Sequence, residues 1–325
     1  MRFRMRKSAA IMMTVILAVM LFASCSKSGN SELRFGTGGS GGMYYSYAEK
    51  LREVSKNSMS FDVRTTAGSS ANIRLLDQGF IDIAIVQSDV LLAEGTQACS
   101  AIAGLYTEAV QIVTAKGSGI DSVYDLEGKR VSVGEEESGV LVNSKQILEV
   151  YGLLLDDIDA RYLSFNDAAE ALKKGEIDAF FCTAGAPTSA VAKLAESMEI
   201  ELVGIEGREA ETLMKLYGGY SDCVISAGTY KGQNSDVKTI GVKAVLIASN
   251  NLDKETVAKL TALIFSKGGD LSAGTPAEGM FNEDYAVLGV PFGFHEGARE
   301  YYAGKGIAVA EAESGGTSAV FGGQD

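Results

Sequence analysis

The chain lacks several residue types on which common functional sites depend. Its 325 residues include no Trp, three Pro and one His. A single imidazole excludes a metal centre built from several histidines, and an acid–base relay that needs more than one of them. The formal net charge is −13, with 42 acidic against 29 basic side chains. Because such a surface repels phosphate backbones, we expect no nucleic-acid partner, and we also expect no metal and no cofactor.

Cysteine is scarce as well, with four in the chain. Three of them, Cys99, Cys182 and Cys223, cannot all pair within one chain, and none has C-x-x-C spacing. Cys182 follows an apolar run, which favours a buried thiol that packs as a small hydrophobe. A disulfide of Cys182 with Cys99 or with Cys223 stays open as the alternative.

The first 24 residues are predicted to be an export signal. Four basic residues precede an apolar run from Ala9 to Ala23, which is too short to favour a membrane span of about 20 residues. Small residues directly before Cys25 resemble a bacterial lipobox, with an ordinary cleaved signal as the alternative. We expect lipid on Cys25 and a tether over residues 25–32 to hold the protein at the extracytoplasmic face of a bacterial membrane, in the periplasm or at the cell surface.

The rest of the chain shows one plan twice. An apolar strand, a loop with Gly and Ser, and a helix occur over residues 33–54 and again over 130–151; a helix, a Gly and an apolar strand follow each time. Gly36 and Gly134 are 98 positions apart, and Gly79 and Gly175 are 96 apart. Apolar strands without alternation indicate parallel strands covered on both faces. The sequence therefore predicts an α/β protein of two lobes with like topology, rather than one large sheet.

Two further apolar strands, over residues 109–115 and 239–248, are predicted to cross between the lobes. Lobe I then takes residues 33–112 and 229–312, and lobe II takes residues 113–228. Residues 313–325 are predicted to be a flexible tail.

The loops that follow the strands are predicted to form a binding site. Ligands of open parallel sheets bind beyond the carboxyl ends of the strands, where residues 36–42, 87–89, 135–139 and 183–187 fall. Helix N-termini there offer free N–H groups and a partial positive charge. Hydrogen bonds to a charged group contribute roughly 1.5–3 kcal/mol each, so three or four suffice for a micromolar ligand, at about 8 kcal/mol. Facing lobes can thus hold a small carboxylate without a metal.

The candidate ligand-binding residues come from both lobes. In lobe I they supply N–H, hydroxyl and amide groups. Ser69 is either a donor or a helix N-cap, and the Gln87 amide can donate and accept. In lobe II they form an anion-binding site opposite. The run Glu135–Glu137 is predicted to be a solvated loop; the alternative is that Glu136 binds an ammonium group of the ligand. The full set is Gly39, Ser40, Gly41, Met43, Tyr44, Ser69, Gln87, Ser138, Gly139, Val140, Thr183 and Gly185.

Two kinds of enzyme fit parts of this pattern. The spacing of Gly36, Gly38 and Gly41 matches the dinucleotide fingerprint, but the acid expected about 20 residues on is not at the end of a second strand. Residues 38–42 also fit G-x-S-x-G around Ser40, with His295 downstream, although no HGGG-like oxyanion segment accompanies them. We keep a secreted serine hydrolase that uses Ser40 and His295 as the alternative function; the structural interpretation of His295 is that it orients the C-terminal turn.

Several ordered motifs between Leu33 and Tyr302 resemble one family of transport receptors. They are GTGGSGGMYY (36–45), GSSANIRLL (68–76), VQSD (86–89), YLSF (162–165), TAGAP (183–187), AGTY (227–230) and the segment 291–302 with its His and paired Tyr. Together they resemble the TAXI-type solute receptors of tripartite ATP-independent periplasmic (TRAP) transporters. The chain departs from the family at residues 136–140, where EESGV replaces a Gly-Ser-Gly-Thr-like turn.

The resemblance implies a fold and a function. The implied fold is the type II periplasmic-binding-protein clamshell, two similar α/β lobes joined by crossing strands, with no enzyme activity. Such receptors capture a small anionic or zwitterionic solute, a glutamate-like amino acid or a dicarboxylate, by closure of the lobes. They deliver it to the integral-membrane permease subunits of the transporter.

Overall fold

The computed structural model describes residues 32–311. Everything below belongs to the unit that begins at Leu33. The predicted signal peptide, the lipid site at Cys25, nearly all of the tether and the C-terminal tail lie outside the described residues. Within residues 32–311 no helix is both long enough and apolar enough to cross a membrane.

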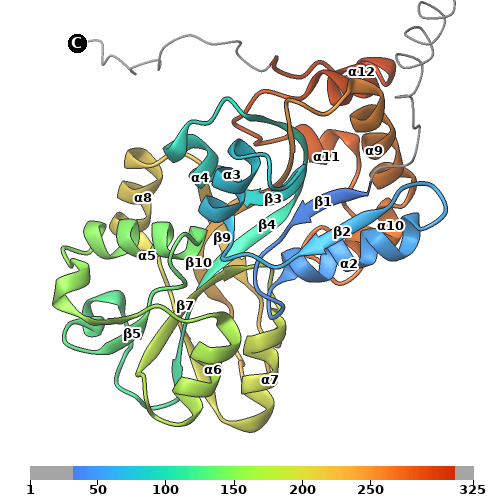
Figure 1. Ribbon diagram of the computed structural model, residues 1–325. Coiled ribbons are helices and arrows are strands. Elements are labelled where there is room, and N and C mark those ends of the chain that lie inside the picture. Colours follow the sequence, from blue (N-terminus) through green and yellow to red (C-terminus); the bar gives the residue numbers. More distant parts are fainter. Residues whose placement is uncertain (1–31, 312–325) are drawn as a thin grey trace, which may run out of the picture. The chain divides into compact units, whose positions relative to one another are not determined.

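Lobe I is built on three parallel strands: β1 (Leu33–Gly36) pairs with β2 (Phe61–Arg64) on one side and with β3 (Ile83–Gln87) on the other. Every residue of β3 is buried, as an unbroken apolar strand between covering helices should be. The helices α2 (Met43–Ser55) and α3 (Ser69–Asp77) follow β1 and β2, and α4 (Ser88–Glu94) follows β3 (Figure 1).

Lobe II repeats the arrangement. The strand β5 (Arg130–Ser132) pairs in parallel with β6 (Asp159–Arg161) and with β7 (Ala179–Ala184). The helices α5 (Gly139–Val150), α6 (Phe165–Lys173) and α7 (Ser189–Ser197) occupy the places of α2, α3 and α4. The remaining elements of this lobe are η1 (Val123–Leu126), η2 (Leu155–Asp157), β8 (Ile200–Val203), α8 (Gly207–Leu216) and β9 (Tyr220–Ile225).

One ion pair shows how closely the two lobes correspond. The Arg34 guanidinium contacts the Asp82 carboxylate at 2.5 Å and donates to the Gly79 carbonyl at 2.7 Å. In lobe II, Arg130 contacts Asp178 at 2.6 Å and donates to the Gly175 carbonyl at 2.7 Å. In both lobes, therefore, an arginine of the first strand (β1 or β5) binds the turn that precedes the third strand (β3 or β7). This agreement is what the predicted internal repeat requires.

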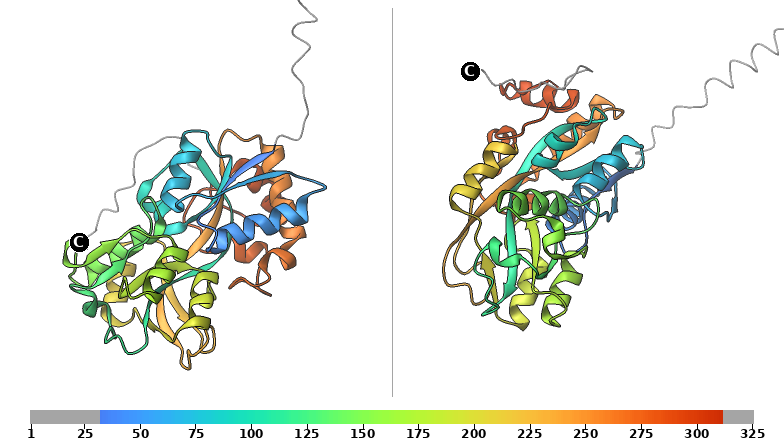
Figure 2. Two further views of the ribbon diagram at one scale, coloured as in Figure 1. Left: turned by 60° about the horizontal axis from the view of Figure 1, so that its bottom comes forward. Right: turned by 90° about the vertical axis from the view of Figure 1, so that its left-hand side faces the viewer.

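Two long antiparallel strands, β4 (Cys99–Ala115) and β10 (Val237–Ser249), join the lobes (Figure 2). In lobe I, β10 pairs with β3; in lobe II, β4 pairs with β7 and β8. The hydrogen-bonded order is β2-β1-β3-β10-β4-β7-β5-β6, with β8 and β9 off this path. The expectation that no single large sheet forms is therefore wrong, because crossing strands of 17 and 13 residues carry the ladder through both lobes.

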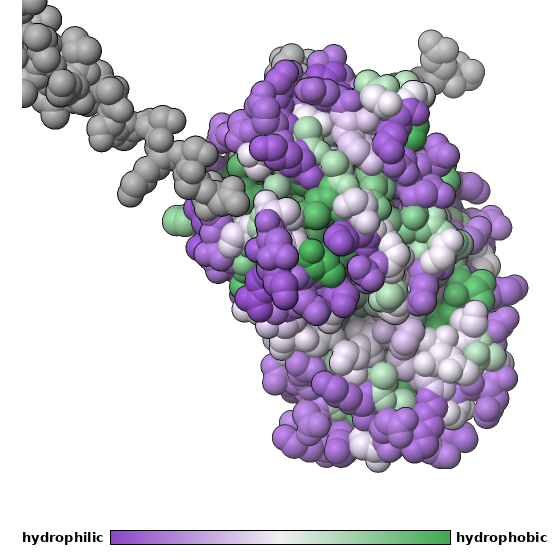
Figure 3. Space-filling view, turned by 90° about the vertical axis from the view of Figure 1, so that its right-hand side faces the viewer, coloured by the Kyte–Doolittle hydropathy of each residue, from purple (hydrophilic) through white to green (hydrophobic). Residues whose placement is uncertain are grey.

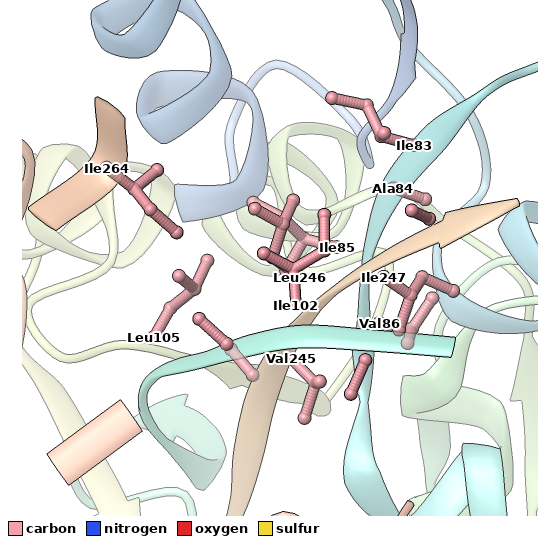
Figure 4. Close-up of a cluster of buried hydrophobic side chains, with 14 of the residues drawn as sticks. Ile83, Ala84, Ile85, Val86, Ile102, Leu105, Val245, Leu246, Ile247 and Ile264 are labelled. Atoms are coloured by element: carbon pink, nitrogen blue, oxygen red, sulfur yellow. The ribbon is translucent and has the colours of Figure 1, made fainter. Parts of the chain in front are cut away.

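The largest core cluster lies in lobe I, between the sheet and the helices that cover it (Figure 4). It joins Ile85 and Val86 of β3 to Ile102 of β4, Leu246 of β10 and Ile264 of the helix α9 (Lys254–Ser266). The covering elements from the C-terminal part are α9 (Lys254–Ser266), α10 (Gly268–Ser272), α11 (Glu283–Val287) and α12 (Glu296–Gly304). Two further clusters fill lobe II. On the face shown in Figure 3, hydrophilic residues predominate toward both ends, and apolar residues form separate patches nearer the middle.

Candidate functional site

A cavity of about 400 Å³ lies where the two lobes meet. Loops and helix starts from both lobes line it, because the carboxyl ends of the parallel strands of each lobe face it. Lobe I contributes residues 38–44, 65–69 and 87, and the crossing strand β4 contributes Glu108. The lining residues of lobe II are 134, 135, 138–140, 163–166, 183 and 184.

The structure brings together all the residues predicted for the site except Gly185. Gly185 packs instead against Met43, so that a Cβ added there would lie 2.5 Å from the Met43 Sδ. Glu135 lines the cavity, whereas Glu136 does not. The part of each lining residue in holding a ligand stays a prediction.

Three helices begin at the cavity without an acidic residue in their first turn, namely α2, α3 and α5. The N-caps of α2 and α3 are Gly42 and Gly68, which have no side chain to accept from the helix. Ser69 is therefore not a cap; its hydroxyl accepts from the Gln87 N–H at 3.1 Å. Both helix starts thus lack a capping side chain and keep backbone donors and a partial positive charge at the cavity, although the Ala71 N–H of α3 donates to the Glu137 carbonyl.

The helix start at Ser138 is different. The Ser138 hydroxyl accepts from the Leu141 N–H at 3.1 Å and donates to the Glu135 carbonyl at 2.6 Å. Its side chain is thus already engaged within lobe II, and the predicted anion seat there is left with backbone groups.

Two buried polar atoms at the cavity have no hydrogen-bond partner within the described residues, Gln87 Oε1 and Thr183 Oγ1. Gln87 is 3% exposed and Thr183 is 4% exposed. Leaving such an atom unsatisfied costs about 1–3 kcal/mol, so a site is favoured in which a bound molecule completes the bonding.

Direct contacts join the lobes beside the cavity. The Ala71 N–H donates to the Glu137 carbonyl at 2.9 Å, and the exposed Arg74 guanidinium pairs with the Glu137 carboxylate at 2.7 Å. Glu136 and Glu137 are exposed in a loop, as predicted for this run, and Glu135 is half-buried. On another side, the Asn143 amide of α5 donates to the buried Asp89 carboxylate of α4 at 2.7 Å.

Glu108 is the lining residue that sequence reasoning missed most plainly. It is 2% exposed, and its Oε2 accepts from the Tyr44 hydroxyl at 2.7 Å. Burial raises the pKa of its carboxyl to about 8; the Tyr44 hydrogen bond acts in the opposite direction, and the negative charge of Asp89 adds to the rise. Glu108 lies inside a strand, away from the loops that the glycine and serine motifs mark; its signal in the sequence is a lone charge between the apolar stretches of residues 99–115.

A family model matches residues 35–306 of the chain, and its description is NMT1-like family. The chain belongs to the NMT1-like family.

Solved structures resemble the NMT1-like chain in fold at low sequence identity. A putative L-cystine ABC transporter protein from Listeria monocytogenes shares 20% identity over 78% of this chain and 98% of that chain, with a TM-score of 0.51. An ancestral arginine-binding protein bound to arginine shares 17% over 77% and 98%, with a TM-score of 0.51. Tv2483 bound to L-arginine shares 14% over 81% and 96%, with a TM-score of 0.52. The predicted fold, that of the type II periplasmic binding proteins, is confirmed.

The serine-hydrolase alternative is not supported for this NMT1-like protein. His295 does not line the cavity that Ser40 lines. It is the N-cap of α12: its side-chain Nδ1 accepts from the Gly297 N–H at 3.2 Å. The backbone N–H of His295 donates to the Ala101 carbonyl. Burial lowers the pKa of its imidazole. His295 therefore stabilises the C-terminal part of the fold rather than activating a nucleophile.

The cysteines that the structure describes in the NMT1-like chain are not paired with one another. Cys99, Cys182 and Cys223 are free thiols, so neither disulfide considered for Cys182 is formed. Over residues 32–311, no cluster of His, Cys, Asp and Glu side chains is arranged to hold a metal ion.

Proposed function

We propose that this NMT1-like protein is an extracytoplasmic solute-binding protein. It captures a small carboxylate, a glutamate-like amino acid or a dicarboxylate, between its lobes and delivers it to the permease of a TRAP-type secondary transporter. The observation that carries the proposal is the cavity between the lobes, with glycine-capped helix starts and the unpartnered atoms of Gln87 and Thr183.

A carboxylate suits the helix starts because they present donors rather than acceptors. The N-terminal turns of α2 and α3 lack both a capping side chain and an acidic residue, so a ligand anion meets backbone N–H groups there other than that of Ala71, which the Glu137 carbonyl occupies. Interaction with the helix dipole contributes about 0.3–1 kcal/mol when exposed and up to about 2 kcal/mol when partly buried. Each charge-assisted hydrogen bond adds roughly 1.5–3 kcal/mol, so the backbone alone supplies much of a micromolar affinity.

Capture by closure follows from the origin of the lining residues. A solute that contacts lobe I at residues 38–44 and lobe II at residues 138–140 favours the conformation in which both contacts exist. We place the hinge in β4 and β10, with lobe I at residues 33–112 and 229–312 and lobe II at 113–228. The closed form is then the state that the permease recognises.

Export and membrane anchoring complete the proposal. The predicted signal over residues 1–24 and the lipid on Cys25 place the protein at the extracytoplasmic face of a bacterial membrane. The motifs shared with TAXI-type receptors support a TRAP permease as partner. The names of the structural neighbours, which include arginine-binding and amino acid transport proteins, support a solute-binding role without enzyme activity.

A thermal-shift screen of the full-length protein in mild detergent tests the proposal. The panel contains free amino acids and dicarboxylates, each beside its methyl ester, which keeps the skeleton but removes the anionic oxygen. We expect at least one free acid to raise the melting temperature and its ester to have no effect. If no free acid stabilises the protein, or if esters stabilise it equally, the proposed function is wrong.

A further inference from the structure

The charges that line the cavity are all of one sign. Its lining residues include no Lys, Arg or His, whereas Glu108 and Glu135 both contribute to it. Glu135 is half-buried and lies within the electrostatic influence of Asp167, while Glu108 is 2% exposed. When both carboxyl groups of the wall are ionised, they repel a purely anionic solute and attract a cationic group.

Among residues 32–311, none of the groups that act on Glu108 is a cation. The titratable groups that act on it or feel its charge are Tyr44 of α2, Tyr106 of β4, Asp89 of α4 and Cys182 of β7. None of these four is positively charged at neutral pH. On β10, Val242 is the register partner of Glu108, and the neighbouring Lys243 directs its amino group 3.6 Å above the Tyr285 ring and to the Tyr285 carbonyl at 3.2 Å.

Another polar atom of the same wall lacks a donor. Gln87 Oε1 is an acceptor only, and it is buried without a partner among the described residues; the Thr183 hydroxyl, which can donate or accept, is also unpartnered there. Both residues line the cavity together with Glu108. A ligand N–H group can donate to Gln87 Oε1, whereas a second carboxylate cannot.

We propose that Glu108 binds a positively charged nitrogen of the solute and releases a proton when the solute binds. This inference deepens the proposed function and rests on it, since the carboxylate of the same solute occupies the helix starts. Before binding, the buried Glu108 carboxyl is protonated. On binding, its O–H proton leaves to solvent, and the resulting carboxylate accepts a hydrogen bond from the ammonium group of the solute.

The direction of the proton transfer follows from burial. With its pKa raised to about 8 by burial, Glu108 is mainly protonated at pH 7 in the empty protein. An adjacent cation favours the ionised form and lowers the pKa. Binding at pH 7 is therefore expected to release close to one proton per solute molecule, and affinity rises with pH until Glu108 is ionised in the empty protein.

Isothermal titration calorimetry of the full-length protein with matched pairs of solutes tests this inference. The pairs are L-glutamate with 2-oxoglutarate, L-leucine with 4-methyl-2-oxopentanoate and L-alanine with pyruvate, which differ only at the nitrogen. Titrations in phosphate and in Tris, whose ionisation enthalpies differ widely, give the number of protons released. We expect the amino acid of a pair to bind at least about tenfold more tightly than its oxo acid, which corresponds to one charge-assisted hydrogen bond.

Variants separate Glu108 from acids outside the cavity. Glu108→Gln keeps the shape and the acceptor for Tyr44; we expect the preference for the amino acid to fall below about threefold and the proton release to vanish. Glu176→Gln, the control at an exposed carboxyl that does not line the cavity, should keep both. If Glu108→Gln fails to fold, the buffer comparison on the unmodified protein still measures the proton.

The outcomes distinguish this inference from the proposed function. Oxo acids that bind as tightly as their amino acids, binding without proton release, or an unchanged preference in Glu108→Gln would overturn the role of Glu108 while capture of a carboxylate stands. If neither member of any pair binds and no free acid stabilises the protein in the thermal-shift screen, the proposed function itself falls, and this inference with it.

Discussion

Replacing Gly139 with Ala tests whether the lobes meet as tightly as the structure shows. A Cβ at this position would lie 2.5 Å from Gln87 Cδ and 2.9 Å from its Nε2, and closer still to its Oε1. Ordinary contacts of a Cβ begin near 3.4 Å. Gly139 does not have a positive φ, so Ala can adopt its backbone conformation and the effect is purely steric.

The size of the effect follows from where Gln87 can go. Its side chain is 3% exposed and belongs to the cavity wall, so the added methyl group must displace the amide or push the lobes apart. Overpacking of this kind costs about 1–3 kcal/mol. We expect Gly139→Ala to lose this much free energy of unfolding and to bind solute more weakly, because displacement of the Gln87 amide or separation of the lobes disturbs the site.

Urea unfolding and calorimetric solute titration measure the two effects. Gly269→Ala is the matched control, since a Cβ there has no neighbour within 4 Å and Gly269 does not have a positive φ. It should leave solute affinity unchanged and leave stability equal or higher by up to about 1 kcal/mol, because Ala loses less conformational freedom than Gly. The double variant Gln87→Ala with Gly139→Ala removes the clash and should be no less stable than Gln87→Ala alone. A Gly139→Ala protein with unchanged stability and affinity would refute the reasoning.

Three further predictions concern pH, the C-terminal cap and the exposed contact between the lobes. Burial raises the pKa of Asp89 from 3.8 to about 7. Between these two pH values the folded protein holds a proton that the unfolded chain has lost, so the free energy of unfolding should fall as the pH rises. Asp89→Asn should flatten that fall in urea unfolding. His295→Ala removes the N-cap of α12 and should lower the free energy of unfolding by about 0.5–2 kcal/mol in the same assay, with solute affinity unchanged. A fluorophosphonate probe for active serines should label neither the unmodified protein nor this variant. Arg74→Gln removes the exposed pair with Glu137 and should weaken solute binding in low salt while leaving it nearly unchanged in high salt; an equal loss in both would contradict an electrostatic role.

Local signals in the sequence were enough to predict the two lobes and most of the cavity lining. Glycines that end helices and unbroken apolar strands are set by neighbouring residues, so the repeat was visible without a structure. The same reasoning placed the loops around Ser40, Gln87 and Ser138 at the carboxyl ends of strands, and the structure brings them to one cavity. The position of each of these loops after its strand is determined by neighbouring residues in the sequence.

The single sheet, the position of Glu108 and the packing of Gly185 depend on contacts between segments distant in the sequence, and only the tertiary structure decided them. The crossing strands join both lobes in one ladder, which the sequence did not predict, because hydrogen bonding between β4 and β10 connects residues more than 100 positions apart. That pairing also fixes which face of β4 each side chain occupies, and it directs Glu108 into the cavity beside Tyr44. Likewise, packing of Met43 against Gly185 keeps the latter out of the lining. A side chain in a strand acquires its surroundings from its partners across the sheet, and a single sequence does not name those partners.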